Sequence, residues 1–114
     1  GRVAEGKNMI IKKNIEQEKS WLFNDGSQPI QLKIVKPEEI NPVEHYHKTM
    51  HEYFYLLQGT AEILVDGNTY DLGAGELLVV EPGEVHKISG YSPDMKVLLL
   101  MPPPVAGDKV IVNS

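Results

Sequence analysis

The sequence predicts a single all-β domain, a barrel or a sandwich of short strands, for three reasons. Seven apolar or alternating runs follow one another at close spacing, and each is bounded by Gly, Pro, Asn or Asp, which favour turns. No segment shows a convincing helical spacing with a clear cap. The length of 114 residues fits one compact domain and leaves no room for two.

The first predicted strand is QLKIVK at 31–36, where polar and apolar residues alternate as they do in half-buried strands. The others follow in chain order: EYFYLLQ (52–58), AEILVD (61–66), NTYDL (68–72), ELLVV (76–80), VHKIS (85–89) and MKVLLLM (95–101). Asp66 and Gly67 predict a hairpin turn between two of these strands, because both residues tolerate a positive φ. GAG at 73–75 and EPGE at 81–84 mark further turns.

The two ends of the chain are expected to lie outside the central β domain. We divide the chain into an N-terminal extension (1–20), the domain (21–104) and a C-terminal tail (105–114). Within the extension, IIKKNIEQEKS (10–20) predicts either a weak helix or an extended edge segment. PPP at 102–104 ends the last core strand, because proline has no N–H to donate. The tail sequence DKVIVNS could pair along a sheet edge or reach a second subunit.

Composition excludes several classes of function. The absence of cysteine rules out disulfides and thiolate metal sites, so nitrogen and oxygen must hold any metal. A formal charge of −5 without a basic cluster argues against nucleic-acid binding. The longest purely apolar stretch, VLLLM at 97–101, is too short to span a membrane. The N-terminus lacks the apolar core of a signal peptide, so we expect a cytoplasmic protein.

The stretch HYHKTMHE contains most of the candidate metal ligands. On a strand, residues two apart point to the same face, so His45 and His47 would present two imidazoles side by side. Glu52 starts the next strand, and its carboxylate would join the pair if it faces the same interior. His86 offers a third imidazole directly after the PGEV turn. Three nitrogens and one oxygen leave two positions of an octahedral ion open, and suit Fe, Mn, Ni, Cu or Zn.

This pattern resembles the two sequence motifs of the cupin superfamily. The first motif runs G-x5-H-x-H-x3,4-E-x6-G, and the matching residues are His45, His47, Glu52 and Gly59. Glu39 stands where the leading glycine would be. An isolated HxH on a strand is a weak signal, because most histidines only form hydrogen bonds. The full motif is far more specific.

The second motif runs G-x5-P-x-G-x2-H-x3-N, and Gly75, Gly83 and His86 match it. Glu81 replaces the proline and Gly90 replaces the asparagine. These departures concern turn residues, so they bear on loop shape rather than on metal ligands. Together the two motifs cover about half of the chain.

The resemblance implies a double-stranded β-helix, that is, a jelly-roll barrel, with a metal in its mouth. The ligands that it implies for one divalent transition metal are His45, His47, Glu52 and His86. In small single-barrel cupins the N-terminal strands often join a partner's sheet, so the resemblance also implies a homodimer. The aromatic cluster WLF at 21–23 would lie at that interface or close the core.

Several other side chains admit two interpretations. His51 fits no ligand position, and is either a surface-loop histidine or a catalytic base that contacts substrate at the pocket rim. Glu81 is either a solvated turn carboxylate or an added acid near the pocket. Tyr53 and Tyr55 are out of phase with Glu52, so they should pack against another layer or a second subunit.

Three functions are consistent with these residues. The first is a metal-dependent enzyme that acts on a small organic substrate, with dioxygenase chemistry considered before isomerase or lyase chemistry. The second is a non-catalytic cupin that binds or senses a sugar-like molecule. The third is a protein whose metal is purely structural, in a closed four-coordinate site. The fold does not choose among them. Neither nucleic acid nor membrane is expected as a partner.

Overall fold

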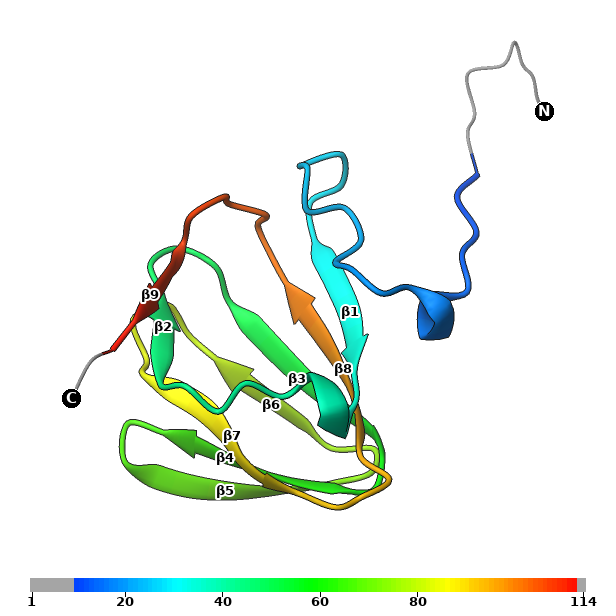
Figure 1. Cartoon of the computed structure of the whole chain (residues 1–114). Coiled ribbons are helices and arrows are strands. Elements are labelled where there is room, and N and C mark those ends of the chain that lie inside the picture. The colour runs from blue at the N-terminus through cyan, green and yellow to red at the C-terminus, as the bar shows by residue number, and fades with distance from the viewer. Residues whose placement is uncertain (1–9, 113–114) are drawn as a thin grey trace, which may run out of the picture.

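The computed structural model of the chain describes residues 10–112, which form two antiparallel β-sheets (Figure 1). In chain order the strands are β1 (Gln31–Val35), β2 (His45–His47), β3 (Glu52–Gln58), β4 (Thr60–Val65), β5 (Asn68–Gly73), β6 (Leu77–Val80), β7 (His86–Tyr91), β8 (Lys96–Met101) and β9 (Lys109–Ile111). Within the described range the helical segments are two 3₁₀ turns, η1 (Ile15–Gln17) and η2 (Pro37–Glu39). No helix among these residues is long and apolar enough to cross a membrane.

The chain passes back and forth between the two sheets. One sheet has the strand order β1-β8-β3-β6, and the other has the order β5-β4-β7-β2-β9. Strands that are distant in sequence, such as β1 and β8, therefore lie side by side (Figure 1). This arrangement is the double-stranded β-helix, or jelly-roll barrel, so the predicted fold class is confirmed.

The predicted strands are all present, with ends that differ from the prediction by one or two residues at most. The histidine pair forms a strand of its own, β2. The tail forms β9, which pairs with β2 at the edge of its sheet, so the edge alternative is the one observed. The segment 10–20 contains η1 and neither a longer helix nor a strand. The rest of the predicted extension, residues 1–9, lies outside the described part of the chain.

The hydrophobic core lies between the sheets. Buried and more exposed residues alternate along β3, β4 and β8, which is the period of two expected of half-buried strands. Phe54, Leu56, Ile63 and Val97 are at most 1% exposed. Burying a side chain of this size stabilises the fold by about 1.5–3 kcal/mol. Glu52 lies on the same face of β3 as Phe54, so the core begins directly beneath the predicted metal ligands.

The outer face of the β1-β8-β3-β6 sheet carries exposed apolar side chains. Tyr55 on β3 lies opposite Leu77 on β6, and these side chains are 37% and 54% exposed. Tyr55 was expected to pack against another layer or against a second subunit. Among the described residues no layer of the same chain covers it. The homodimer stays a prediction, and this face is where we expect the second copy to bind.

Light scattering checks that expectation. The purified chain should have the mass of a dimer, and Leu77→Glu should shift the population towards the monomer, because it places a charge in an apolar contact. A monomeric wild type at working concentration would contradict the prediction.

Gly59 is the turn position that tolerates substitution least. It joins β3 to β4 with φ of +74°, and a Cβ there would lie 2.7 Å from Asp94 Oδ1 and 3.0 Å from the backbone Cα of Met95. We expect Gly59→Ala to lower the free energy of unfolding by about 2–4 kcal/mol, measured by denaturant titration. Gly67→Ala is the control, because φ is +85° there but nothing lies within 4 Å. It should lose about 1 kcal/mol, and equal losses would refute the steric argument.

Candidate metal centre

Strand pairing brings the three histidines together. His45 on β2 lies directly opposite His86 on β7, and directly opposite residues of antiparallel strands project to the same face. His47 shares that face because it is two residues from His45. The ring centroids of His45 and His86 are 4.4 Å apart, and those of His47 and His86 are 5.7 Å apart. Three imidazoles therefore converge from one sheet.

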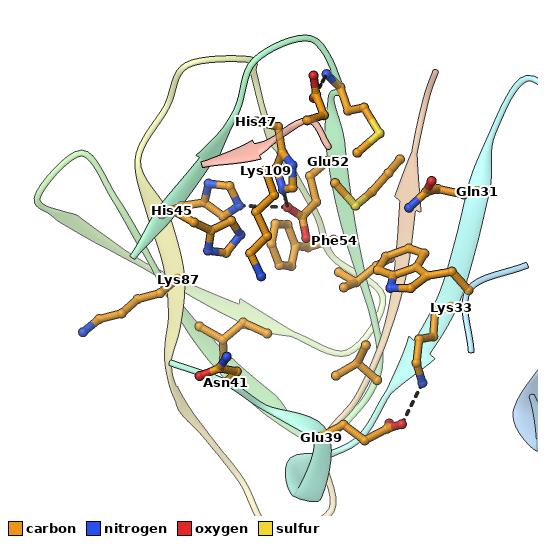
Figure 2. Close-up of a pocket in the computed structure, with 18 of the residues that line it drawn as sticks. Gln31, Lys33, Glu39, Asn41, His45, His47, Glu52, Phe54, Lys87 and Lys109 are labelled. Carbon is orange, nitrogen blue, oxygen red and sulfur yellow. Dashed lines mark hydrogen bonds and ion pairs between the residues drawn. The ribbon is translucent and has the colours of Figure 1, made fainter. Parts of the chain in front are cut away.

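Glu52 meets these imidazoles from the opposite sheet. Its Oε1 lies 2.8 Å from Nε2 of His86 and 3.2 Å from Nε2 of His47 (Figure 2). One possible ligand atom from each of His45, His47, Glu52 and His86 lies within 4.8 Å of all the others. The four residues that the sequence indicated are thus gathered at one point. They form a group that could hold a metal ion, and we call them the metal group.

Hydrogen bonds to the backbone orient two of the rings. Nδ1 of His45 lies 2.8 Å from the carbonyl oxygen of Val43, and Nδ1 of His86 lies 2.8 Å from that of Glu84. A carbonyl oxygen can only accept, so each Nδ1 carries the hydrogen and donates it. In the neutral ring, Nε2 then has a free lone pair. Histidine ligands of metals usually donate their other ring N–H in this way.

Burial and charge act on the acid–base properties of the group. Burial alone would raise the pKa of Glu52, but hydrogen bonds from His47 and His86 outweigh it and lower the pKa. Burial would lower the pKa of His86, but the hydrogen bond and the charge of Glu52 raise it. Burial lowers the pKa of His45 to about 4. Without metal, the centre is therefore held by an ionised Glu52 and a His86 that gains a proton easily, beside a neutral His45.

His47 has an unsatisfied atom. Its Nδ1 is buried and has no hydrogen-bond partner among the described residues. Buried polar atoms without partners are rare in folded proteins and often mark functional sites. Together with three imidazoles and a carboxylate, which suit a divalent transition metal, this atom indicates that the residues fit a metal.

A carboxylate from the tail holds the loop between His47 and Glu52. Asp108 is 3% exposed, and its Oδ2 accepts hydrogen bonds from the backbone N–H of Thr49 at 2.9 Å and of Met50 at 2.8 Å. The distance between the candidate ligands His47 and Glu52, on either side of the loop, thus depends on a residue from the other end of the chain. No local pattern in the sequence marks Asp108, so its role could not be predicted.

A cavity of about 380 Å³ opens onto the four residues. Both sheets line it, and its polar side chains beyond the metal group include Gln31, Lys33, Asn41 and Lys109 (Figure 2). Trp21 also lines it and packs against the core.

His51 takes no part in this cavity. Its Nδ1 lies 2.7 Å from Oε1 of Glu81, and both side chains are largely exposed. The structure therefore places His51, the candidate catalytic base, on the surface beside Glu81 of the turn at 81–84. Neither residue belongs to the group that could hold a metal ion.

Comparison with protein-family models identifies the family of this chain. The family model of the cupin domain matches residues 31–101, more than half of the chain. The chain belongs to the cupin family. The matched span contains all four residues of the metal group, whereas Asp108 and Lys109 of this cupin lie beyond it.

Several relatives of this cupin are known. The uncharacterized protein MJ1618 of Methanocaldococcus jannaschii is 29% identical, and the match covers 83% of this chain and 88% of that protein. The solved structure of a cupin protein from Bacteroides fragilis matches with a TM-score of 0.67 and 21% identity, over 95% of this chain and 91% of its own. Streptomyces PAC13, a nucleoside dehydratase solved with uridine, matches with a TM-score of 0.67 and 17% identity over 93% of each chain. At these identities, the solved structures show the fold alone.

Asp108 provides a test of the loop. Asp108→Ala should lower the free energy of unfolding by about 1–3 kcal/mol, because it leaves the buried N–H of Met50 and the partly buried N–H of Thr49 without their acceptor. Asp108→Asn keeps an accepting oxygen and should lose less. Both are measured by denaturant titration at neutral pH.

The same substitution has a pH dependence. Burial would raise the pKa of Asp108, but the hydrogen bonds from Met50 and Thr49 lower it from 3.8. Its contribution to stability is present above the unfolded pKa and is lost as pH falls through the lowered folded pKa. The difference between wild type and Asp108→Ala should therefore shrink in acid, and a constant difference would contradict this account.

Proposed function

We propose that this cupin is a metal-dependent enzyme that acts on a small organic substrate. The metal would be one divalent transition ion, and its ligands would be His45, His47, Glu52 and His86. The observation that carries the proposal is the convergence of these side chains, from two sheets, to within 4.8 Å. The Nδ1 hydrogen bonds of two of the histidines support it, because they leave Nε2 as the ligand atom.

A bound metal would supply Lewis acidity towards a substrate oxygen, and iron or copper would also permit oxygen chemistry. The four residues would leave two positions of an octahedral ion for other groups, and the cavity that adjoins them would admit a substrate. We propose dioxygenase chemistry as the first reaction type and isomerase or lyase chemistry as the second. The likeness to PAC13 supports the fold, so the choice of reaction rests on the site.

The chain itself would enclose the substrate. The cavity volume of about 380 Å³ falls within the range of small-molecule sites. The apolar side chains of Val35, Phe54 and Leu99 line the cavity, and contact with a substrate there would remove apolar surface from water. The amides of Gln31 and Asn41 could orient a polar group of the substrate.

The alternative is a non-catalytic cupin that binds a sugar-like molecule next to the metal. The polar lining of the cavity could form hydrogen bonds with the hydroxyl groups of a sugar. It consists of the amides of Gln31 and Asn41 and of Lys33 and Glu39, which form an ion pair of 2.7 Å. Such a protein would bind metal and ligand without turnover, so a substrate screen on the metal-loaded chain separates the two functions.

Metal content tests the ligand assignment. Protein purified without a nickel column should contain about one metal ion per chain by elemental analysis, and His47→Ala should abolish stoichiometric binding. His51→Ala is the matched control and should keep its metal, because His51 lies beside Glu81 outside the cavity. Undiminished metal in His47→Ala, or none in the wild type even after reconstitution, would overturn the proposal.

Metal uptake should also release a proton. The pKa of His86 is raised, so this ring is protonated in the metal-free protein at and below that pKa. A ligand histidine must be neutral, so the affinity for metal should fall as pH drops through this pKa and level off above it. Calorimetry in two buffers with different heats of ionisation counts the released protons. An affinity that does not change between about pH 5 and 8 would contradict this prediction.

A further inference from the structure

A lysine faces the candidate metal centre from β9. Lys109 lies directly opposite His47 in the β2–β9 pair, so the two side chains project to the same face of the sheet. His47 faces the interior, and Lys109 accordingly lines the cavity. Figure 2 shows the Lys109 side chain extending past His45 towards Phe54.

The ammonium group of Lys109 has no carboxylate partner. The lysine ion pairs found within residues 10–112 involve Glu16 or Glu39, and none of them includes Lys109. Lys33 also lines the cavity, but Glu39 neutralises it. Lys87 borders the cavity as well, yet its side chain points away from the centre in Figure 2. In the described part of the chain, Lys109 is thus the uncompensated cation next to the metal group.

The charges of the loaded site favour an anion. A divalent metal brings more positive charge than the single carboxylate of Glu52 removes when the three histidines are neutral. Lys109 adds a further positive charge on the same side of the cavity. Lys109 is exposed, so it lies where the cavity opens to solvent, and the excess of positive charge there attracts an anionic ligand.

One lysine suits a carboxylate better than a phosphate. Residues 10–112 contain no arginine, whose forked guanidinium commonly binds phosphate. The described helical segments are single 3₁₀ turns, which offer no helix N-terminus for a phosphate. A carboxylate has one oxygen for a metal-side contact and a second oxygen for an ammonium, so it can use both features of this site.

The remainder of the cavity suits an apolar body. Trp21, Val35, Ile40 and Leu99 line it, and Phe54 lies beneath the metal group with 1% of its surface exposed. An aromatic or branched alkyl group attached to the carboxylate would be removed from water against these side chains.

We infer that the substrate of this cupin is a small carboxylate with an apolar body, and that Lys109 binds the carboxylate group. This inference deepens the proposed function and rests on it for the metal. The contribution of Lys109 can be measured separately, because it depends on binding and not on turnover.

The experiment compares benzoate with its uncharged analogue benzamide. The whole chain is titrated in metal-free and zinc-loaded forms, with calorimetry and the fluorescence of Trp21, the one tryptophan, as readouts. Benzoate should bind the zinc-loaded wild type more tightly than benzamide does. Lys109→Met keeps the length of the side chain and removes its charge, so it should weaken benzoate binding by about threefold to fivefold, as expected of an exposed ion pair. It should leave benzamide binding unchanged, and Lys109→Arg should restore most of the benzoate affinity.

Lys87→Met is the matched control, because it removes the same charge from a side chain that points away from the centre. It should bind benzoate like the wild type. An equal loss in both methionine variants would overturn the inference, since it would reflect overall charge only. Wild-type affinity in Lys109→Met, or no benzoate binding by the wild type, would also overturn it.

Metal content separates this inference from the proposed function. If the wild type holds no metal but Lys109→Met still weakens benzoate binding, the metal-dependent enzyme is refuted and the anion site stands. If the protein holds its metal and Lys109→Met has no effect, the metal centre stands and the role of Lys109 is refuted.

Discussion

Glu52 carries a carboxylate into the space between the two sheets, where only 5% of its surface is exposed. A buried charge of this kind is strongly unfavourable unless hydrogen bonds and an opposite charge surround it. Both are supplied by imidazoles of the facing sheet, through Nε2 of His47 and of His86. The same contacts that satisfy Glu52 place the candidate ligands within reach of one ion, so stability at the barrel mouth and metal binding have one origin.

The short strand β2 brings its histidines to Glu52 through pairing with its two neighbouring strands. It contains three residues and pairs with β7 on one side and β9 on the other. The first pairing sets His45 opposite His86, and the second sets His47 opposite Lys109. Asp108, one residue before β9, fixes the loop that leads from β2 to Glu52. The tail therefore supports the centre both as a strand and through a side chain.

Local sequence rules could predict the candidate ligands and most strands. The period of two and the turn residues mark each strand, and the spacing of His45, His47 and Glu52 needs only that period and one short loop. The position of Lys109 could not be predicted, because pairing between β2 and β9 joins segments that are far apart and carry no mutual signal. The tail sequence DKVIVNS was open to pairing along a sheet edge or to reaching a second subunit, and neither alternative identified β2 as its partner.

The positions of His51, Glu81 and Trp21 could not be predicted either, because each depends on contacts between distant segments of the chain. His51 and Glu81 each looked unusual in the sequence, and the structure explains them together, since they lie 2.7 Å apart on the surface. Trp21 was expected either to close the core or to lie at a dimer interface. It packs against the core and lines the cavity.

The contact between Asp108 and Thr49 joins residues 59 positions apart in the chain. Contacts of such long sequence separation form slowly, because the intervening chain must lose its conformational freedom before they can stabilise anything. The mouth of the barrel should therefore be completed at a late step of folding, after the β4–β5 hairpin and its neighbours have assembled. A metal would then bind a barrel that has already formed, unlike the ion of a zinc finger, which organises an unfolded chain.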